Sequence, residues 1–331
     1  MIKSVSTAVI VKIRSRYAKR LTNDEFDSLS SCRSVSDVAS QLKKNPIYSE
    51  ILSRTDNKEI RREFLESILN YSFLEDLSII AKYDLSFEKN IFKYVITRFE
   101  VQQICKFLLF LKSHTVDSFE CSFPSFFKYR SKIKFDDLNK AETYENLLDA
   151  IKKTDYYTIL NKYNSNNFDI NLIETSLYNY IFKLLLNSVS KFNHKISKDM
   201  KKILYNYIDI SNIVRIVRSK IFYNAEDSYI DNIIFKFGDY KFSKYDILNK
   251  SNFSNFDFIN DNVKSIKDLE KFSKILRFKW SKKNIRYSNI AEIVGFSYII
   301  LKEVEISNLI NIIEGVRYGL PKEFIQAAII R

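Results

Sequence analysis

The sequence predicts an almost entirely α-helical protein, and three observations support this fold class. Apolar residues recur at helical spacing, as at Ile306, Leu309, Ile310 and Ile313. No stretch shows the sustained alternation of apolar and polar residues that is typical of a half-buried strand. Only four Gly and three Pro occur among 331 residues, so a sandwich or a barrel would lack the turn residues that it needs.

The first third of the chain is predicted to begin with a helix over residues 4–21. Two helix starts follow, Thr22–Glu25 and Ser34–Asp37, in which a capping hydroxyl stands three residues before an acidic side chain. Pro46 is expected to stop the short helix that follows the second start, because proline cannot continue the helical hydrogen bonds. Further helices are predicted over Glu59–Ile68, Leu74–Lys82 and Ile91–Ser113.

The rest of the chain continues in the same way. Pro124 lies in an aromatic-rich crossover, Phe119–Tyr129, and Asn249–Asn262 is predicted to be an irregular connector. Gly319 and Pro321 are expected to end the last long helix, and Pro321 to open a short final one. The other helices expected here are Tyr144–Lys153, Ile170–Ser188, Lys198–Tyr207, Ile208–Lys220, Ile266–Trp280, Ser288–Lys302 and Val304–Val316.

A pattern of ten residues occurs three times along the chain. Phe99–Leu108, Ile208–Val217 and Val304–Ile313 share the order apolar, acid, apolar, any, amide, apolar, any, any, apolar, apolar. The first two copies are offset by 109 residues (208 − 99), and the second and third by 96 residues (304 − 208). Repetition at a fixed period indicates duplicated structural units.

Two further pairs of segments recur at the same offset. Leu42–Tyr48 matches Ile151–Tyr157, and Phe64–Tyr71 matches Ile173–Tyr180. We therefore predict three similar helical modules, arranged about an approximate threefold axis, with the last module diverged. Their predicted boundaries are 1–117, 118–225 and 226–331.

The repeated acid and amide stand three residues apart, so each pair shares a helix face. They are Glu100 with Gln103, Asp209 with Asn212, and Glu305 with Asn308. We favour a structural interpretation, in which the acid lies near a helix N-terminus and the amide satisfies a neighbouring turn. The alternative is that the pairs contact a partner.

The sequence offers little support for catalysis. His114 and His194 are the only histidines and lie in different predicted modules. No phosphate-binding loop, zinc-protease or nucleophile-elbow motif occurs, and no cluster of potential metal ligands is evident. We therefore predict neither enzymatic activity nor a cofactor.

The cysteines and the apolar runs indicate the environment of the chain. Cys32, Cys105 and Cys121 are odd in number and form no Cys-x-x-Cys motif, so we expect free thiols in a reducing compartment. The longest apolar runs, such as Ile293–Leu301, are too short to span a bilayer.

The chain is basic, with 53 Lys and Arg against 40 Asp and Glu, a net charge of +13. Such a balance is typical of proteins that bind nucleic acid, an anionic membrane surface or an acidic partner. The stretch Lys264–Arg286 carries nine basic residues around Trp280. We interpret it as the solvated face of an amphipathic helix. The alternative is a surface that stacks and neutralises nucleic acid.

Two segments near the C-terminus carry a family resemblance. Lys302-Glu-Val-Glu-Ile-Ser-Asn-Leu309, followed by Gly319-Leu-Pro-Lys-Glu-Phe-Ile325, resembles the end of the C subunits of V-type (A-type) ATP synthases. The eukaryotic counterpart is the d subunit of the vacuolar ATPase. The helix that carries Arg14 and Arg16, and the Lys43–Tyr48 segment, are also similar. Family members often carry Arg where this chain has Ile310, so a role of that Arg is not carried over.

The resemblance implies a non-catalytic, funnel-shaped helical protein with a central cavity. It would be a peripheral subunit on the cytoplasmic face of the membrane, between the central stalk and the rotor ring of an ATPase that transports protons or sodium. The competing hypothesis is a basic helical-repeat protein that binds nucleic acid or another acidic partner. The residues predicted to contact partners are Arg14, Arg16, Arg20, Glu100, Asp209, Asn212, Lys282, Lys283, Glu305, Asn308 and Arg317.

Overall fold

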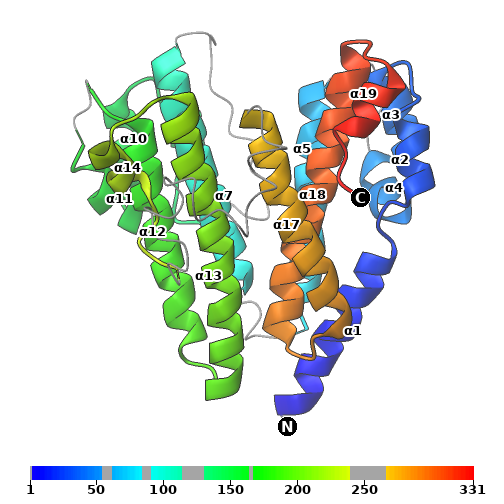
Figure 1. The fold of residues 1–331 in the computed structure, drawn as a ribbon, viewed down its shortest axis with the longest axis horizontal. Coiled ribbons are helices and arrows are strands. Elements are labelled where there is room, and N and C mark those ends of the chain that lie inside the picture. Colours follow the sequence, from blue (N-terminus) through cyan, green and yellow to red (C-terminus); the bar gives the residue numbers. More distant parts are fainter. Residues whose placement is uncertain (1, 54–61, 84–90, 114–129, 164–166, 239–265) are drawn as a thin grey trace. The chain divides into compact units, whose positions relative to one another are not determined.

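The computed structural model describes residues 2–53, 62–83, 91–113, 130–163, 167–238 and 266–331, and every regular element in these ranges is a helix (Figure 1). This confirms the predicted all-α fold class. The chain divides into two compact units. Unit 1 comprises residues 1–89 and 274–331, and unit 2 comprises residues 90–273. The predicted crossover at Phe119–Tyr129 and the connector at Asn249–Asn262 lie outside the described residues.

Unit 1 joins the two ends of the sequence. The helix α18 contacts α1, α3, α5 and α19, so the last part of the chain is packed against the first (Figure 1). Most of the apolar side chains of α18 are buried, as expected for a central helix that is apolar on all sides. The helices of this unit are α1 (Ile2–Ala18), α2 (Asn23–Leu29), α3 (Val35–Leu42), α4 (Pro46–Ser53), α5 (Arg62–Ala81), α18 (Ala291–Arg317) and α19 (Lys322–Ala327), together with the end of α17 (Ile266–Tyr287).

Both predicted helix starts are confirmed. The Thr22 hydroxyl accepts a hydrogen bond from the Glu25 amide at 3.2 Å, and the Glu25 carboxylate accepts one from the Thr22 amide at 2.7 Å. Ser34 and Asp37 form the same reciprocal pair at the start of α3. The helix before Pro46 ends as predicted, since α3 stops at Leu42, but Pro46 also opens a further helix, α4, that was not predicted. Proline is tolerated there, since a first-turn amide has no helical acceptor.

The predicted end of the last long helix is confirmed. Gly319 has φ +62°, and the Leu320 amide donates to the Gly315 carbonyl at 2.8 Å, which closes the helix end. The chain then turns at Pro321 into α19, as expected. Ile325 of α19 packs directly against Gly315 of α18, so that a Cβ atom at position 315 would lie 2.5 Å from Ile325 Cγ1.

Replacing Gly315 with Ala should therefore destabilise unit 1, because the new methyl group has no room beside α19. We expect a loss of about 1–3 kcal/mol, which is typical of overpacking, measured by urea unfolding. In Gly315→Ala/Ile325→Ala the clash is removed, so the double variant should lose less than the sum of the two single variants. Additive losses would contradict this explanation.

Unit 2 is built around three long helices, with α12 in contact with both α7 and α13 (Figure 1). Shorter helices cover this layer, with α10 against α7 and α14 against α12 and α13. The beginning of α17 belongs to this unit, where Leu269 packs against Ile213 and Ile230. The helices are α7 (Lys93–Ser113), α9 (Phe135–Leu138), α10 (Tyr144–Ile151), α11 (Asp155–Leu160), α12 (Ile170–Val189), α13 (His194–Val217), the π-helix η2 (Arg218–Phe222) and α14 (Asp227–Ile233).

Several helices are longer than predicted. A single helix, α18, replaces Ser288–Lys302 and Val304–Val316, and a single helix, α13, runs through the expected break after Tyr207. Likewise, α5 continues past Ile68 without interruption. The repeated acids therefore stand inside long helices, and the prediction that they lie near helix N-termini was wrong.

Candidate functional site

Glu305 is the centre of a buried polar cluster in unit 1. Its Oε1 atom accepts a hydrogen bond from the Tyr48 hydroxyl at 2.6 Å. The same atom forms an ion pair with Lys302 Nζ at 2.7 Å. Its Oε2 atom accepts a hydrogen bond from the Leu21 amide at 3.3 Å. Lys302 and Glu305 are both buried, so their attraction is little screened by water. This carboxylate thus ties α18 to α4 and to the chain that follows α1.

A second buried carboxylate, Asp76 of α5, lies in the same unit. It accepts a hydrogen bond from the Tyr298 hydroxyl at 2.8 Å and pairs with Arg16 Nη2 at 2.7 Å. Burial raises the pKa of Tyr298 well above its ordinary value of 10.0, and Asp76 adds to the shift. Burial also raises the pKa of Tyr48 well above 10.0, and the nearby Glu305 adds to this shift. Both tyrosines therefore stay protonated and act as hydrogen-bond donors.

Glu100 makes the corresponding contact in unit 2. It is 7% exposed and accepts a hydrogen bond from the Tyr156 hydroxyl at 2.6 Å and another from the Ser131 hydroxyl. Glu100 stands on α7 and Tyr156 on α11, as Glu305 stands on α18 and Tyr48 on α4. Two of the three repeated acids thus receive a tyrosine hydroxyl from a short helix.

Two of the repeated amide side chains, Asn212 and Asn308, bind backbone groups of a later segment that folds back against their helix. The Asn212 side chain donates to the Phe235 carbonyl at 3.1 Å and accepts from the Phe235 amide at 2.9 Å. Asn308 makes the same pair of hydrogen bonds with Ile330, at 2.8 and 3.0 Å. This agrees with the structural interpretation of the amides. Gln103 is also buried. The two Asn side chains bind backbone 23 and 22 positions further along, and the residues at that separation from Gln103 lie outside the described residues.

Asp209 completes the repeated set and is 7% exposed. The backbone at Gly238 lies so close to its carboxylate that a Cβ atom at this position would clash with Asp209 Oδ1. Glycine at 238, with φ +159°, thus permits a close approach of the returning chain to α13. Glu100, Asp209, Asn212, Glu305 and Asn308 are all buried, so their described contacts are internal.

The buried position of Glu100 predicts a pH dependence. Burial raises the pKa of its carboxyl group above the ordinary value of 4.5, against smaller opposing effects of Ser131 and Tyr156. At a pH between the pKa of Glu100 in the unfolded chain and its pKa in the folded protein, the folded protein therefore holds a proton that the unfolded chain has lost. Its contribution to stability is complete below the unfolded pKa and is lost as pH rises through the folded pKa.

Glu100→Gln should remove this contribution. The difference in free energy of unfolding between wild type and Glu100→Gln, measured by urea titration from pH 4 to 8, should shift against the wild type as pH rises. A difference that does not vary with pH would contradict a raised pKa. Glu142→Gln, at an exposed position just before α10, is the matched control and should not give this trend.

The predicted arginines of α1 have different positions. Arg14 donates to the Ile285, Arg286 and Ser288 carbonyls at 2.8–3.0 Å and so caps the end of α17. Arg16 is held by Asp76, as described above. Arg20 donates to the Tyr17 carbonyl at 3.1 Å, and its guanidinium lies 4.3 Å from the centre of the Tyr17 ring.

The predicted basic residues outside α1 also differ in exposure. Lys282 is half-buried, with its Nζ atom 5.3 Å from the centre of the Phe278 ring. Lys283 and Arg317 are exposed. The guanidinium of Arg317 lies 5.5 Å from the centre of the Tyr318 ring.

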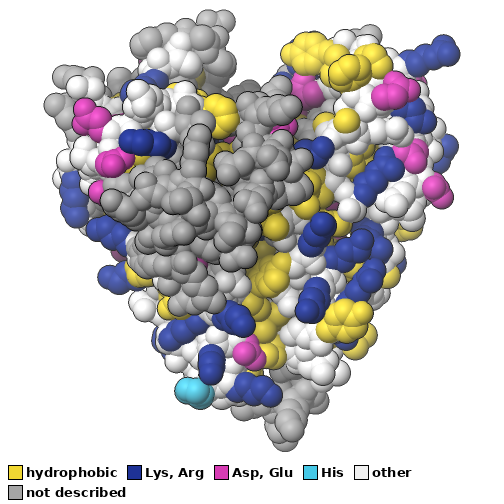
Figure 2. Space-filling model, viewed as in Figure 1, with side chains coloured by type: hydrophobic (Ala, Val, Ile, Leu, Met, Phe, Trp, Pro, Cys, Tyr) yellow, Lys and Arg dark blue, Asp and Glu magenta, His cyan; other side chains and the backbone are white. Residues whose placement is uncertain are grey.

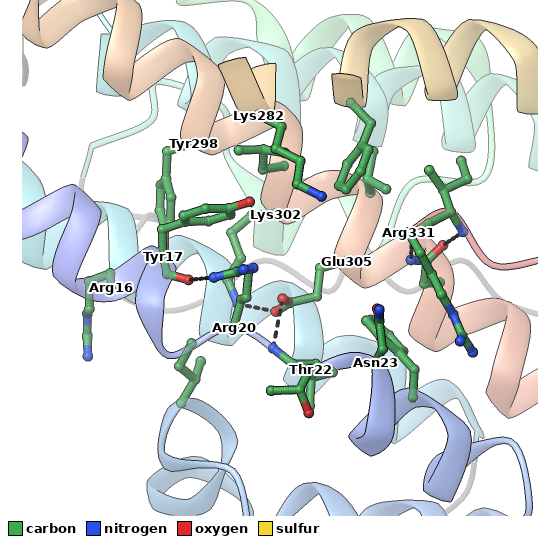
Figure 3. Close-up of a pocket in the computed structure, with 18 residues that line it drawn as sticks. Arg16, Tyr17, Arg20, Thr22, Asn23, Lys282, Tyr298, Lys302, Glu305 and Arg331 are labelled. Carbon is green, nitrogen blue, oxygen red and sulfur yellow. Dashed lines mark hydrogen bonds and ion pairs between the residues drawn. The ribbon is translucent and has the colours of Figure 1, made fainter. Parts of the chain in front are cut away.

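A cavity of about 250 Å³ lies in unit 1 between α1, α2, α17 and α18 (Figure 3). In the figure, Arg20 and Lys302 lie beside Glu305, Lys282 reaches toward them from α17, and Arg16 points away. Glu305 is the one acidic side chain in its lining, against five basic side chains. The basic side chains are Arg16, Arg20, Lys282, Lys302 and Arg331.

Two kinds of side chain stand out on the surface. Lys and Arg outnumber Asp and Glu on the described part of the face drawn in Figure 2. An apolar group of side chains lies exposed at the end of unit 1 that carries α19. It consists of Tyr318, Leu320 and Phe324, which are 69%, 49% and 70% exposed. We call these three residues the tail patch.

The described residues contain no group of three or more His, Cys, Asp or Glu side chains that is placed to hold a metal ion. No helix within the described ranges is long and apolar enough to cross a membrane. Cys32 and Cys105 are free thiols, whereas Cys121 and His114 lie outside the described residues. Burial raises the pKa of Cys105 to about 12, so this thiol is unreactive at neutral pH. His194 is an exposed residue at the first position of α13.

Sequence patterns missed the partners of the buried acids. Tyr48 comes from α4, Asp76 from α5, and Tyr298 and Lys302 from α18, so no local pattern in the sequence marks them as a set. The one available signal was that Tyr48 lies in a repeated segment, but that comparison aligned it with Tyr157. The structure gives the corresponding contact to Tyr156, one residue earlier.

One protein family matches nearly the whole chain. No curated protein matches the chain. The model of one family, described as ATP synthase (C/AC39) subunit, matches residues 9–328. That match includes the helices that carry all three repeated acids and most of the cavity lining. The chain therefore belongs to the family of ATP synthase (C/AC39) subunits.

Proposed function

We propose that this chain is a non-catalytic subunit of the central stalk of a V-type or A-type rotary ATPase. In this proposal it lies on the cytoplasmic face of the membrane and links the rotating stalk to the ring that carries protons or sodium. The family match over residues 9–328 is the observation that carries the proposal. Sequence and structure are in agreement with a role that depends on shape and contacts.

The internal contacts of unit 1 suit a protein that transmits force. Helix α18 is fixed along its length, by Glu305 to Tyr48, by Glu314 to Arg62 and by Asn308 to Ile330. Arg331 Nη2 pairs with Asp27 Oδ1 at 2.5 Å, which ties the last residues to α2. Packed interiors have low compressibility, so a torque applied to such a unit displaces it as a body.

The surface provides candidate contacts for partner subunits. The tail patch is apolar, and the exposed Arg317 and Lys322 stand beside it in the sequence. Exposed aromatic side chains with an adjacent arginine are common in protein interfaces. We propose that the tail patch, Lys282 and Lys283 contact other subunits of the same assembly.

Three modules around a central cavity remain part of the proposal. The tyrosine contacts of Glu100 and Glu305 and the matching hydrogen bonds of Asn212 and Asn308 support a repeated unit. The two compact units divide the chain at other positions than the predicted module boundaries. In the proposed arrangement each long helix would take polar contacts from short helices, which for Glu100 is α11 later in the chain and for Glu305 is α4 near its start.

Co-purification tests the proposed partners. The tagged chain, expressed with the stalk and ring subunits encoded in the same genome, should bring down the stalk subunits at physiological salt. The control is a tagged, unrelated helical protein of similar size and net charge. The competing hypothesis predicts strong retention on a polyanion column that high salt abolishes, with none of the stalk subunits recovered. That result would overturn the proposed function.

The half-buried Lys282 and the exposed Lys283 give a sharper prediction. Charge reversal at Lys282 and Lys283 should weaken assembly with the stalk, and the loss should depend on salt, because surface charges are screened. The matched control is charge reversal at Lys152 and Lys153, an exposed pair in unit 2 with the same change of net charge. Assembly should be measured by size-exclusion chromatography at low and high salt. Equal losses in both variants would mean that only net charge matters.

A further inference from the structure

The cavity of unit 1 has more positive charge than its own contacts neutralise. Arg16 pairs with Asp76, Lys302 with Glu305 and Arg331 with Asp27. The two remaining cations of the lining are Arg20 and Lys282. Within the described residues neither contacts an acidic side chain. Arg20 has the Tyr17 carbonyl and ring as its contacts, and Lys282 has the Phe278 ring.

The two unneutralised cations are held in place by aromatic rings. A contact with a ring face uses the π electrons and not the N–H groups, so it leaves hydrogen-bond donors available, apart from Arg20 Nη1, which donates to the Tyr17 carbonyl. Burial raises the pKa of Tyr17, so its hydroxyl remains a neutral donor and adds no negative charge to the lining. The only lining carboxylate, Glu305, is engaged by Lys302, Tyr48 and Leu21.

We propose that this cavity binds a phosphate group that carries two negative charges. A phosphomonoester has a charge of about −1.5 to −2 at neutral pH, which matches the two cations. A guanidinium fork and an ammonium group are the usual donors to phosphate oxygens. The cavity volume of about 250 Å³ is below the roughly 300–1,000 Å³ of pockets for drug-sized ligands, so it suits a phosphate with a small substituent.

Two sources offer this chemistry, namely free phosphate compounds and the head group of an anionic lipid. The proposal does not depend on the proposed stalk function, because it rests on the lining of one unit. A ligand bound here would contact α1, α17 and α18 at once, so it would also stabilise the folded unit.

The test uses the full chain and two double variants of equal charge. Arg20→Gln/Lys282→Gln removes the two cations of the cavity. Lys19→Gln/Lys283→Gln removes exposed neighbours on the same two segments, neither of which lines the cavity. Binding of inorganic phosphate is measured by calorimetry at constant ionic strength. Binding to phosphatidylcholine vesicles, with and without phosphatidic acid, is measured by sedimentation.

We expect wild type and Lys19→Gln/Lys283→Gln to bind alike. The cavity variant should bind about tenfold more weakly or worse, as expected for the loss of charge-assisted hydrogen bonds. Binding of inorganic phosphate would assign a free phosphate compound, and binding only to phosphatidic acid vesicles would assign a lipid head group. Should the cavity double variant fail to fold by circular dichroism, Lys282→Gln against Lys283→Gln carries the same comparison.

Three results would overturn the proposal. The wild type would bind neither probe, or both double variants would lose binding equally, or the cavity variant would bind as well as the wild type. Equal losses would show that affinity follows net charge and not the cavity. None of these results bears on co-purification with stalk subunits, so the two proposals fail separately.

Discussion

Removal of residues 303–331 should abolish cooperative folding of unit 1. The deletion takes away the second half of α18 and all of α19, and it exposes the apolar faces of the helices that pack against them. Loss of a single large buried side chain typically costs about 2–5 kcal/mol, against a total stability of roughly 5–15 kcal/mol. The deleted segment includes Ile306, Leu309, Ile312 and Ile313, all of which are buried. The truncated chain should aggregate or melt without a sharp transition in calorimetry.

The milder variant Ile313→Ala serves as the control for this deletion. Ile313 is 0% exposed, so its truncation should lower the melting temperature and still leave a cooperative transition. A truncated chain that unfolds cooperatively and assembles with the stalk would contradict the central position that the structure gives to α18.

Replacing Lys302 with Met should be the most damaging single change in the buried cluster. Lys302 is 4% exposed and pairs with Glu305, which is 8% exposed. Without the lysine, the carboxylate stays buried with only the Tyr48 hydroxyl and the Leu21 amide as donors. Breaking a buried ion pair in this way costs about 3–5 kcal/mol. Urea unfolding of Lys302→Met measures the loss, and the exposed Lys322→Met should be nearly neutral.

A double variant separates the lost charge from the lost packing. Lys302→Met/Glu305→Gln has no buried charge at this position and should recover most of the stability that Lys302→Met loses. If the double variant is as unstable as the sum of the two single variants, then the ion pair is not the reason for the loss.

Local signals in the sequence predicted most of the helices and several of their ends. The capping pairs at Thr22 and Ser34 and the stop at Gly319 depend on residues within a few positions of each other, so they can be recognised without the fold. The expected breaks in α13 and α18 were wrong for a physical reason. No Gly or Pro stands at Tyr207 or Glu303, so nothing there ends a helix that is packed on several sides.

The candidate sites were less predictable, because their contacts are distant in sequence. Tyr48 and Glu305 are 257 positions apart. The cavity is lined both by Arg20, just after α1, and by Lys282 of α17. The repeat did identify the acids and amides, and the two Asn side chains bind backbone, though at positions 22 and 23 residues further along the chain and not in an adjoining turn. It did not indicate that the acids are buried and receive tyrosine hydroxyls, since a helix pattern does not specify what packs against it.

Coupling of ATP hydrolysis to ion movement tests the proposed function most directly. The complete ATPase, the same complex prepared without this chain, and that complex with the chain added back would be compared in sealed vesicles. Hydrolysis and ATP-driven ion transport would be measured together. We predict that hydrolysis continues without the chain, that transport stops, and that addition of the chain restores transport. Equal transport with and without the chain would contradict its role as the link between stalk and ring.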